Sequence, residues 1–162
     1  MGLGVICFWR GVGEYCKNGC FGIAGERGWT LAEREYRHSA LTGRVIGCAM
    51  RVHSALGRSY QEAIYQRALE IEMADEGLAF EREREIPIFY KGHNIGSRRV
   101  DFLVEEKIPV ELKALGKLEA GHFVQTLNYL VAFKLEVGLL INFGAGSLEF
   151  RRVENSELVE RR

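Results

Sequence analysis

Apolar residues recur along the chain with two periods, and each period predicts a different kind of element. From residue 41 they are spaced three and four apart, which predicts an amphipathic helix that ends at Gly57. The apolar stripe of this helix consists of Leu41, Val45, Ala49, Val52 and Leu56. A second helix is predicted over about residues 60–76, with Ser59 as its N-cap and Gly77 as its C-terminal stop.

After Gly77 the pattern changes to the alternation that is typical of strands. Three segments follow it, separated by KGHN and by a turn at residues 105–107: FEREREIPIFYKG, SRRVDFLVEE and KIPVELKAL. A third helix is predicted over about residues 118–135. The continuous apolar run GLLINFG then indicates a strand buried on both faces, and LEFRRVE is a candidate edge strand. This order predicts an α/β fold with a central mixed β-sheet flanked by α-helices.

The three-residue turn at residues 105–107 sets a register for the strands beside it. Val104 then lies opposite Ile108, and counting outward places Asp101 opposite Glu111. Because side chains alternate between the two faces of a strand, one face of this hairpin is wholly apolar. The apolar face holds Val100, Phe102, Val104, Ile108, Val110 and Leu112. The other face holds Arg99, Asp101, Leu103, Pro109, Glu111 and Lys113.

Asp101 and Glu111 are therefore predicted to be cross-strand neighbours of like charge, which destabilises a sheet unless something compensates. A divalent cation such as Mg²⁺ would compensate, because it binds carboxylate oxygens together with water and phosphate oxygens. Lys113, on the same face, is within reach of a metal-bound water or a phosphate. The alternative is an ordinary solvated polar face, on which Lys113 neutralises Glu111.

The charge and the composition exclude some functions. Acidic and basic residues balance at 22 each, so the net charge gives no long-range attraction to nucleic acid or to a membrane. Any site for a polyanion must then be a local patch. We find no plausible secretory signal and no apolar stretch long enough to cross a bilayer, so we expect a cytoplasmic protein with reduced thiols.

Residues 1–30 differ from the rest of the chain, because they are rich in glycine and contain Cys7, Cys16 and Cys20. They hold no CxxC pair, so a poorly ordered leader, or sequence upstream of the true start, is favoured over a zinc module. We expect a single domain over residues 31–155 and a charged tail over residues 156–162.

The hairpin also carries a resemblance to a known family. Asp101, followed after an interval by Glu111-Leu112-Lys113, matches the D…(D/E)xK signature of the PD-(D/E)XK nuclease superfamily, with Val100 in place of the usual proline. Other matching segments, over about residues 41–146, are RVHSALG, SYQEAIYQRALE, PIFYKG, QTLNYL and GLLINFG. Together they resemble the bacterial GxxExxY family, a branch of that superfamily.

The resemblance implies a restriction-endonuclease-like core that hydrolyses phosphodiester bonds of DNA or RNA with Mg²⁺ or Mn²⁺. It implies that Asp101, Glu111 and the Leu112 carbonyl hold the metal, and that Lys113 orients the nucleophile and offsets charge in the transition state. One alternative is a non-catalytic module that keeps the fold and binds nucleic acid or a partner. Another is a subunit of a larger assembly.

Glu62 has two interpretations. The resemblance makes it an additional carboxylate at the metal, in a motif where Ser59 replaces the first glycine and Tyr65 is expected to pack. However, S-x-x-E is also a capping box, in which Glu62 bonds back to the amide of Ser59. These two roles do not fully exclude each other.

Gln125 and Tyr129 lie four residues apart on the predicted third helix and share a face. They resemble the QxxxY element of several nuclease branches, which implies that Gln125 lies near the active site or the nucleic acid. The alternative is packing of the helix on the sheet, which is favoured for Tyr129. His53 is expected to be a cap or a core group without a chemical role.

Basic residues gather in the sequence around the hairpin and are candidate phosphate contacts. They are Arg98, Arg99 and Lys117, together with Lys91 and Lys113. Arg151 and Arg152 are candidates to extend this patch. Binding through such a patch is expected to be modest and strongly dependent on salt.

Overall fold

The computed structural model describes residues 38–159. The elements in this part of the chain are α1 (Ser39–Leu56), α2 (Glu62–Asp75), β1 (Phe80–Tyr90), β2 (His93–Val104), β3 (Ile108–Lys113), α3 (Ala120–Phe133), β4 (Val137–Asn142), β5 (Glu149–Glu154) and α4 (Ser156–Val159). This order is the predicted one, with the short helix α4 added inside the predicted charged tail. The predicted leader over residues 1–30, with its cysteines, lies outside the described residues.

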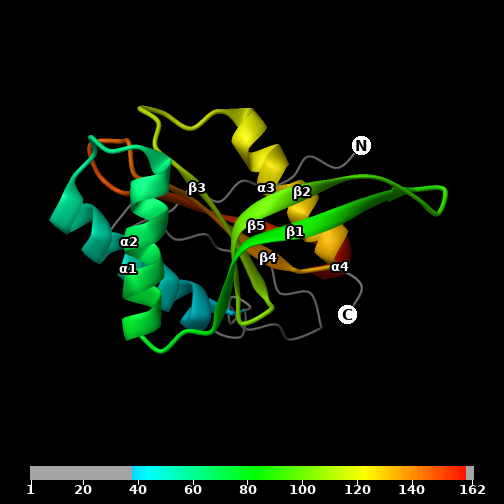
Figure 1. Ribbon diagram of the computed structural model, residues 1–162, viewed down its shortest axis with the longest axis horizontal. Helices are drawn as coiled ribbons and strands as arrows, with labels where there is room; N and C mark the ends of the chain where they lie inside the picture. The colour runs from blue at the N-terminus through cyan, green and yellow to red at the C-terminus, as the bar shows by residue number, and fades with distance from the viewer. Residues whose placement is uncertain (1–37, 160–162) are drawn as a thin grey trace, which may run out of the picture. The chain divides into compact units, whose positions relative to one another are not determined.

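The five strands form one mixed sheet in the order β1-β2-β3-β4-β5 (Figure 1). β3 and β4 are parallel and are connected through α3, whereas the other neighbouring strands are antiparallel. Every residue of β4 is buried, as the run GLLINFG predicted, and β5 is an edge strand, as LEFRRVE predicted. The predicted restriction-endonuclease-like α/β core, a mixed sheet flanked by helices, is confirmed.

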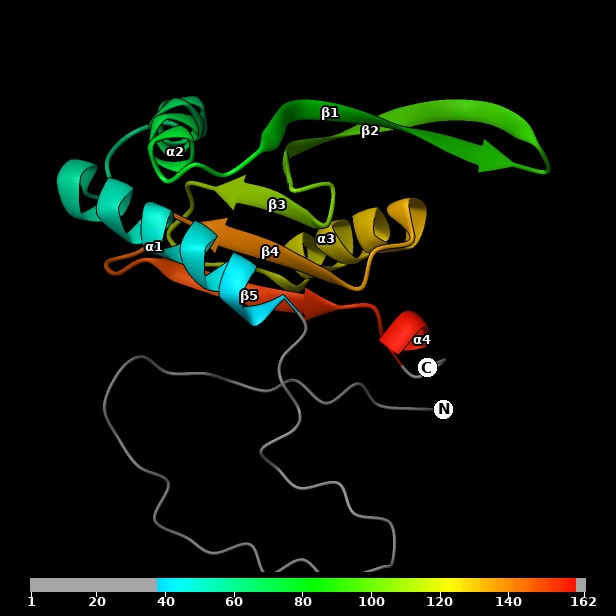
Figure 2. The same ribbon diagram turned by 90° about the horizontal axis from the view of Figure 1, so that it is seen from below.

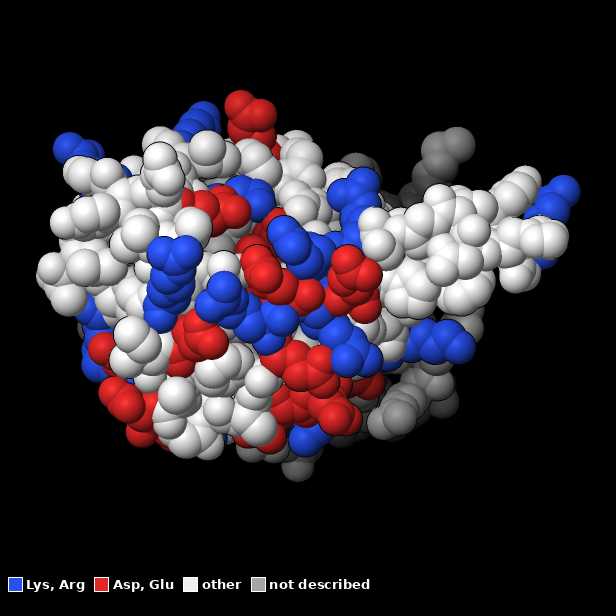
Figure 3. Space-filling view, in the orientation of Figure 1, with Lys and Arg blue, Asp and Glu red and all other residues white. Residues whose placement is uncertain are grey.

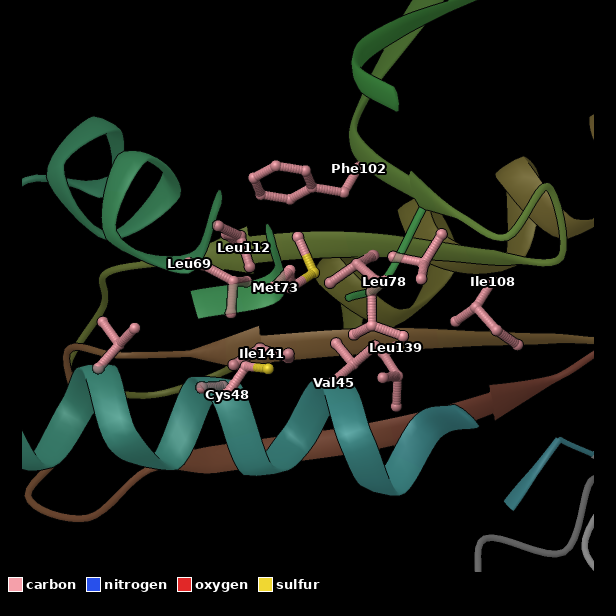
Figure 4. Close-up of a cluster of buried hydrophobic side chains, with 14 of the residues drawn as sticks. Val45, Cys48, Leu69, Met73, Leu78, Phe102, Ile108, Leu112, Leu139 and Ile141 are labelled. Carbon is pink, nitrogen blue, oxygen red and sulfur yellow. The ribbon is translucent and has the colours of Figure 1, made fainter. Parts of the chain in front are cut away.

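Helices cover both faces of the sheet (Figure 2). Buried side chains of α1 and α2 meet those of β2, β3 and β4 in the main core, part of which is shown in Figure 4. Val137 and Leu139 of β4 face this core, so Gly138 between them faces the other way. A Cβ on Gly138 would lie 3.2 Å from the Leu130 side chain, which places α3 on the opposite face. Among residues 38–159, no helix is long and apolar enough to span a membrane.

Both helix ends that were predicted at glycine are confirmed. α1 ends before Gly57 and α2 ends shortly before Gly77, and their φ angles of 68° and 71° lie in the region that favours glycine. The amide of Gly77 donates to the Ala74 carbonyl (2.9 Å) and that of Leu78 donates to the Met73 carbonyl (3.0 Å). These two bonds form a Schellman motif, which satisfies carbonyl groups at the end of α2.

The predicted start of the second helix is wrong. α2 begins at Glu62, so Ser59 lies in the preceding loop and is not the N-cap. The hydroxyl of Tyr65 holds this loop, because it accepts a hydrogen bond from the Tyr60 amide (3.2 Å) and donates one to the Gly57 carbonyl (2.7 Å). Glu62 is therefore not the third helical residue, and the predicted capping box does not form.

The register predicted for the β2–β3 hairpin is confirmed by its Cα pairs, which are Phe102↔Val110, Leu103↔Pro109 and Val104↔Ile108. Most residues of the predicted apolar face lie in the main core. Val100 is an exception, because it packs with Ile86 and with Tyr129 of α3 in a separate cluster. The prediction that Val100 shares the face of Phe102 is therefore wrong.

Asp101 and Glu111 are not a cross-strand pair, although the predicted register would make them one, because the β2–β3 ladder ends at Phe102. The β1–β2 ladder is irregular at the same point. It skips Asp101 and its neighbour Glu83, and Glu83 has a φ of 54°. The departures of Val100 and Asp101 from the predicted pattern thus lie beside a point where the β1–β2 ladder lacks one pair and Glu83 has a positive φ angle.

Beyond the sheet, β1 and β2 continue as a two-stranded ribbon that projects from the body of the domain (Figures 1 and 2). β2 begins earlier than predicted, at His93, so the connection is the two-residue turn Lys91-Gly92 instead of KGHN. Both turn residues have positive φ angles, 49° and 81°, as in a type I′ turn. The ladder shifts by a bulge between Ile88 and Phe89. We call residues 86–98 the arm.

Candidate active site

The end of β3 brings Glu111 and Lys113 to the same side of the strand. Glu111 is only 4% exposed, which is unusual for a carboxylate. Lys113 Nζ lies 2.7 Å from Glu111 Oε1, and the Lys113 side chain is 14% exposed. The two residues thus form a buried ion pair, which disfavours the alternative of an ordinary solvated polar face.

Helix α3 supplies a second hydrogen bond to the same carboxylate. Gln125 Nε2 donates to Glu111 Oε1 (2.5 Å) and to the Tyr129 hydroxyl (3.0 Å). That hydroxyl in turn donates to the Arg99 carbonyl on β2 (2.9 Å). This series of bonds joins α3 to β3 and β2 and fixes the orientation of the Glu111 carboxylate. Gln125 therefore contacts the candidate site directly, while Tyr129 is a buried residue that orients it.

Asp101 is tied to β3 through the backbone. Its Oδ2 accepts a hydrogen bond from the Leu112 amide (2.7 Å), and its Oδ1 accepts one from Gln66 Nε2 of α2 (3.2 Å). Leu112 lies between Glu111 and Lys113 in the sequence. The Asp101 carboxylate is thus held beside the segment that carries both of these charges, although it does not face Glu111 across the ladder.

Glu62 is the first residue of α2 and is half-buried. Burial raises the pKa of its carboxyl group, while Lys113 lowers this pKa and Asp101 raises it. The charge on Glu62 therefore interacts with the charges on β2 and β3. Gln66 lies one helical turn further along α2, where it bonds to Asp101.

The Glu111 carboxyl group is the most strongly perturbed of these acids. Burial and, to a smaller extent, the neighbouring Asp101 raise its pKa to about 7, against the lowering effect of Lys113. Burial also raises the pKa of Asp101, against the lowering effect of the bond from the Leu112 amide. Ionisation of these carboxyl groups is therefore unfavourable in the isolated protein, and a cation bound beside them would favour it.

One atom of the cluster has no hydrogen-bond partner among the described residues. This atom is Glu111 Oε2, which is buried. Buried polar atoms are nearly always bonded, so an unpartnered carboxylate oxygen needs an explanation. A divalent cation supplies one, because Mg²⁺ and similar ions bind carboxylate oxygens.

Within residues 38–159, no group of three or more His, Cys, Asp or Glu side chains is arranged to hold a metal ion. Mg²⁺ does not require such a group, since it is commonly bound by one or two carboxylates together with waters and substrate phosphates. The interacting carboxyl groups of Glu111 and Asp101 thus suit a hard cation that shares its ligands with a phosphate group.

The chain that follows Lys113 is fixed by the end of β4. The Asn142 side chain accepts a hydrogen bond from the Leu115 amide (2.9 Å) and donates one to the Leu115 carbonyl (2.8 Å). The Phe143 amide also donates to the Lys113 carbonyl (2.8 Å). A Cβ on Gly144 would lie only 2.4 Å from the Leu115 amide nitrogen, so the two segments approach more closely than any other residue would allow.

Comparison with known proteins places this arrangement in a family. A family model described as the PD-(D/E)XK nuclease superfamily matches residues 39–153, which include the strands β1 to β4, the helices α1 to α3 and all of β5 except its last residue. The chain belongs to the PD-(D/E)XK nuclease superfamily. Nucleases of this superfamily act on nucleic acid and generally use divalent metals.

A solved structure, that of SSO0001, is similar to this PD-(D/E)XK protein at 20% sequence identity and a TM-score of 0.47. The similarity covers 76% of this chain, and the chain spans 64% of SSO0001. Comparison with curated proteins gives no significant match.

The predicted phosphate contacts of this PD-(D/E)XK domain lie on β2 and in the loop that follows β3. Arg98 is exposed on the arm, and Lys117 is exposed in the loop between β3 and α3. Arg99 is exposed on β2, and its side chain lies 3.9 Å from Glu83. Basic and acidic side chains are interleaved over the centre of the face seen in Figure 3, so the surface there is not uniformly basic.

Two other predicted contacts lie elsewhere in the domain. Arg151 and Arg152 are on β5, at the opposite edge of the sheet from the arm, and they form ion pairs with Glu149 and Glu154. They therefore do not extend a patch around the hairpin. His53 Nε2 lies 3.4 Å from the Ala145 carbonyl oxygen, and the His53 ring stacks on the ring of Phe143.

One residue that touches the site was not predicted from the sequence. Gln66 bonds to Asp101, and it follows Glu62 by one helical turn, so both residues lie on the same side of α2. The four-residue spacing of Glu62 and Gln66 was the signal in the sequence that could have indicated a place for Gln66 near the site. Without the contact to Asp101, a glutamine at this position is indistinguishable from any polar residue on a helix.

Proposed function

We propose that the protein is a divalent-metal-dependent nuclease of the GxxExxY branch that hydrolyses phosphodiester bonds of nucleic acid. The Glu111 carboxylate carries this proposal. One of its oxygens accepts bonds from Lys113 and Gln125, while the other is buried without a partner among the described residues. A carboxylate that is held in one orientation but left incompletely bonded is expected of a ligand for a cation.

The proposed metal ligands are the carboxylates of Asp101 and Glu111 and the carbonyl of Leu112, with Glu62 as an additional carboxylate. These are hard oxygen donors, which suit Mg²⁺ or Mn²⁺. When bound, such an ion would polarise the scissile phosphate and lower the pKa of a water molecule.

Lys113 has the central role among the protein's own groups. Its ammonium group has three N–H donors, and the contact with Glu111 Oε1 occupies one of them. The remaining donors are available to orient the attacking water and to offset the charge that develops on the phosphate. Because the Lys113 side chain is largely buried, it is already positioned before substrate arrives.

Two glutamines act as positioning residues in this proposal. Gln125 holds the Glu111 carboxylate through a 2.5 Å bond, so that the unpartnered oxygen keeps one direction. Gln66 does the same for Asp101 from α2. Arg98, Arg99 and Lys117 are the proposed contacts to substrate phosphates, and residues 31–155 are the proposed nuclease domain.

The test is a cleavage assay with purified protein, Mg²⁺ or Mn²⁺, and single- and double-stranded DNA and RNA. Lys113→Ala is expected to lower the cleavage rate by about 100-fold or more, the scale of losing one donor to a developing charge. Lys107→Ala is the matched control, since it removes an exposed lysine from the other end of β3. Absence of cleavage of every substrate by the wild type would contradict the proposal and favour a non-catalytic module.

A further inference from the structure

The arm exposes large apolar side chains that the proposed active site does not use. Phe89, Tyr90 and Ile95 are 62%, 61% and 64% exposed. Single exposed apolar residues are common on protein surfaces, but a cluster of three on one projecting ribbon is typical of an interaction site. In Figure 3 the arm is largely free of charged side chains along its length and is basic at its tip.

The charge of the arm has one sign. Residues 86–98 contain Lys91 and Arg98 and no acidic residue. Among the described residues, neither of these cations forms an ion pair. Lys91 Nζ instead lies 5.5 Å from the centre of the Tyr90 ring, so a cation and an aromatic face are presented together. A polyanion that also carries flat aromatic groups would match both the cation and the aromatic face.

The strand edges of the arm are poorly suited to pairing with another strand. Pro87 lies on the edge strand β1 and has no amide hydrogen to donate. The bulge after Ile88 and the φ of 146° at Gly96 interrupt the regular ladder. Addition of a strand from another protein is therefore disfavoured, which leaves the side chains as the binding groups. A second copy of the chain would also bring like charges together.

The arm is connected to the proposed active site through one strand. β2 runs from the arm to Asp101, and the Arg99 carbonyl accepts the hydrogen bond that links β2 to Tyr129 and Gln125. At a rise of about 3.3 Å per residue, the strand from Asn94, which pairs with Phe89, to Asp101 spans about 23 Å. To contact the rings, a nucleic acid strand would therefore have to extend about 23 Å beyond the scissile phosphate.

We propose that the arm binds single-stranded nucleic acid, with the Phe89 and Tyr90 rings stacked on unpaired bases and Lys91 and Arg98 on phosphates. Stacking on aromatic side chains needs a free base face, which a base inside a duplex does not offer. This inference rests on the proposed nuclease function for the choice of nucleic acid as partner, but it concerns binding and not cleavage.

Binding is measured by fluorescence anisotropy with labelled single-stranded DNA and RNA of about 16 nucleotides, at the upper end of known single-strand sites. The same sequence as a duplex is the comparison, and EDTA prevents cleavage. Phe89→Ala and Tyr90→Ala are each expected to raise the Kd for the single strand about tenfold, the scale of one base–ring stack. Ile71→Ala is the matched control, because Ile71 is 62% exposed on α2, and it should leave the Kd unchanged.

Two further variants separate stacking from other causes. Phe89→Trp keeps an aromatic ring and should retain wild-type binding, whereas a loss of binding would mean that the ring does not stack on bases. Lys91→Ala should reduce the slope of log Kd against log salt by about 0.7, as expected for one phosphate contact on a single strand. A dinucleotide substrate is too short to reach the rings, so its cleavage should not respond to the variants at Phe89, Tyr90 or Lys91.

The outcomes distinguish this inference from the proposed function. Arm variants that bind the single strand within twofold of the wild type would overturn the inference even if the protein cleaves nucleic acid. If the wild type binds the single strand through its rings but cleaves no substrate, the result would support the inference about the arm and contradict the proposed nuclease function. A dimer in sedimentation that dissociates in Phe89→Ala, without any change in Kd, would assign the arm to self-association and overturn the inference.

Discussion

The end of β3 and the arm place their side chains in opposite environments. At the end of β3, the charged residues Glu111 and Lys113 are buried, whereas on the arm the aromatic residues Phe89 and Tyr90 are in water. Each arrangement is unfavourable in the isolated protein, since burial disfavours a charge and water disfavours an apolar surface. In our proposals each is relieved by a different part of the substrate complex, the buried charges by a cation and phosphate and the rings by bases.

The largest expected difference between the two regions is in the response to pH. The pKa of Glu111 is raised from 4.5 to about 7 in the folded protein. A group with a raised pKa stabilises the fold while it is protonated, so this contribution is complete below about pH 4.5 and is lost as the pH rises through about 7. The difference between the two pKa values corresponds to about 3 kcal/mol. Glu111→Gln should therefore gain stability relative to the wild type over this range.

The measurement is the free energy of unfolding in urea for both proteins between pH 5 and pH 8, without metal. Phe89→Ala provides the comparison, because the arm contains no carboxyl group and its variant should follow the pH dependence of the wild type. A constant difference between Glu111→Gln and the wild type would show that the Lys113 contact keeps Glu111 ionised throughout.

An intermediate effect is expected for Glu62, which is half-buried beside the site. Because the capping box with Ser59 does not form, Glu62→Gln should leave the stability almost unchanged. It should lower metal-dependent cleavage by about tenfold or more, the scale of losing one positioned group. Asp75→Asn makes the same chemical change at an exposed position on α2 and should cleave normally. Equal activity of these two variants would remove Glu62 from the site.

The smallest effect is expected for the stability of the arm. Phe89→Ala should change the free energy of unfolding by less than about 0.5 kcal/mol, as is usual for an exposed position. Urea denaturation of this variant at neutral pH checks the prediction. A loss of several kcal/mol would mean that the ring is covered in the folded protein, and the contrast between the two regions would then fail.

The parts of the fold that followed from the sequence are those fixed by local patterns. The three-residue turn and the alternation of apolar residues gave the β2–β3 register, and the uninterrupted run in β4 gave a strand buried on both faces. The glycines at the ends of α1 and α2 have the backbone angles that the prediction required. In each case neighbouring residues decide the conformation, so one sequence was enough.

The errors lie where contacts made only in the folded chain decide the conformation. Ser59 was a plausible N-cap, but Tyr65 bonds to the loop before α2 and the helix begins later. Val100 packs in a separate cluster, next to the point where the β1–β2 ladder lacks a pair, and no feature of the sequence near Val100 indicates this. The signature of the candidate site could be recognised from the spacing of Asp101, Glu111 and Lys113 in the sequence. The contacts of Asp101 with α2 and with the β3 backbone form only in the folded chain.

The attachment of the segment after Lys113 to β4 bears on how such a domain can evolve. Asn142 and Phe143 hold this segment to the sheet, and Gly144 leaves no room for a side chain beside it. The position of the lysine is therefore set by the sheet and does not depend on the length of the loop that leads to α3. Insertions in that loop would be tolerated during sequence drift, whereas almost every replacement of Gly144 would push the backbone beside Lys113 out of place.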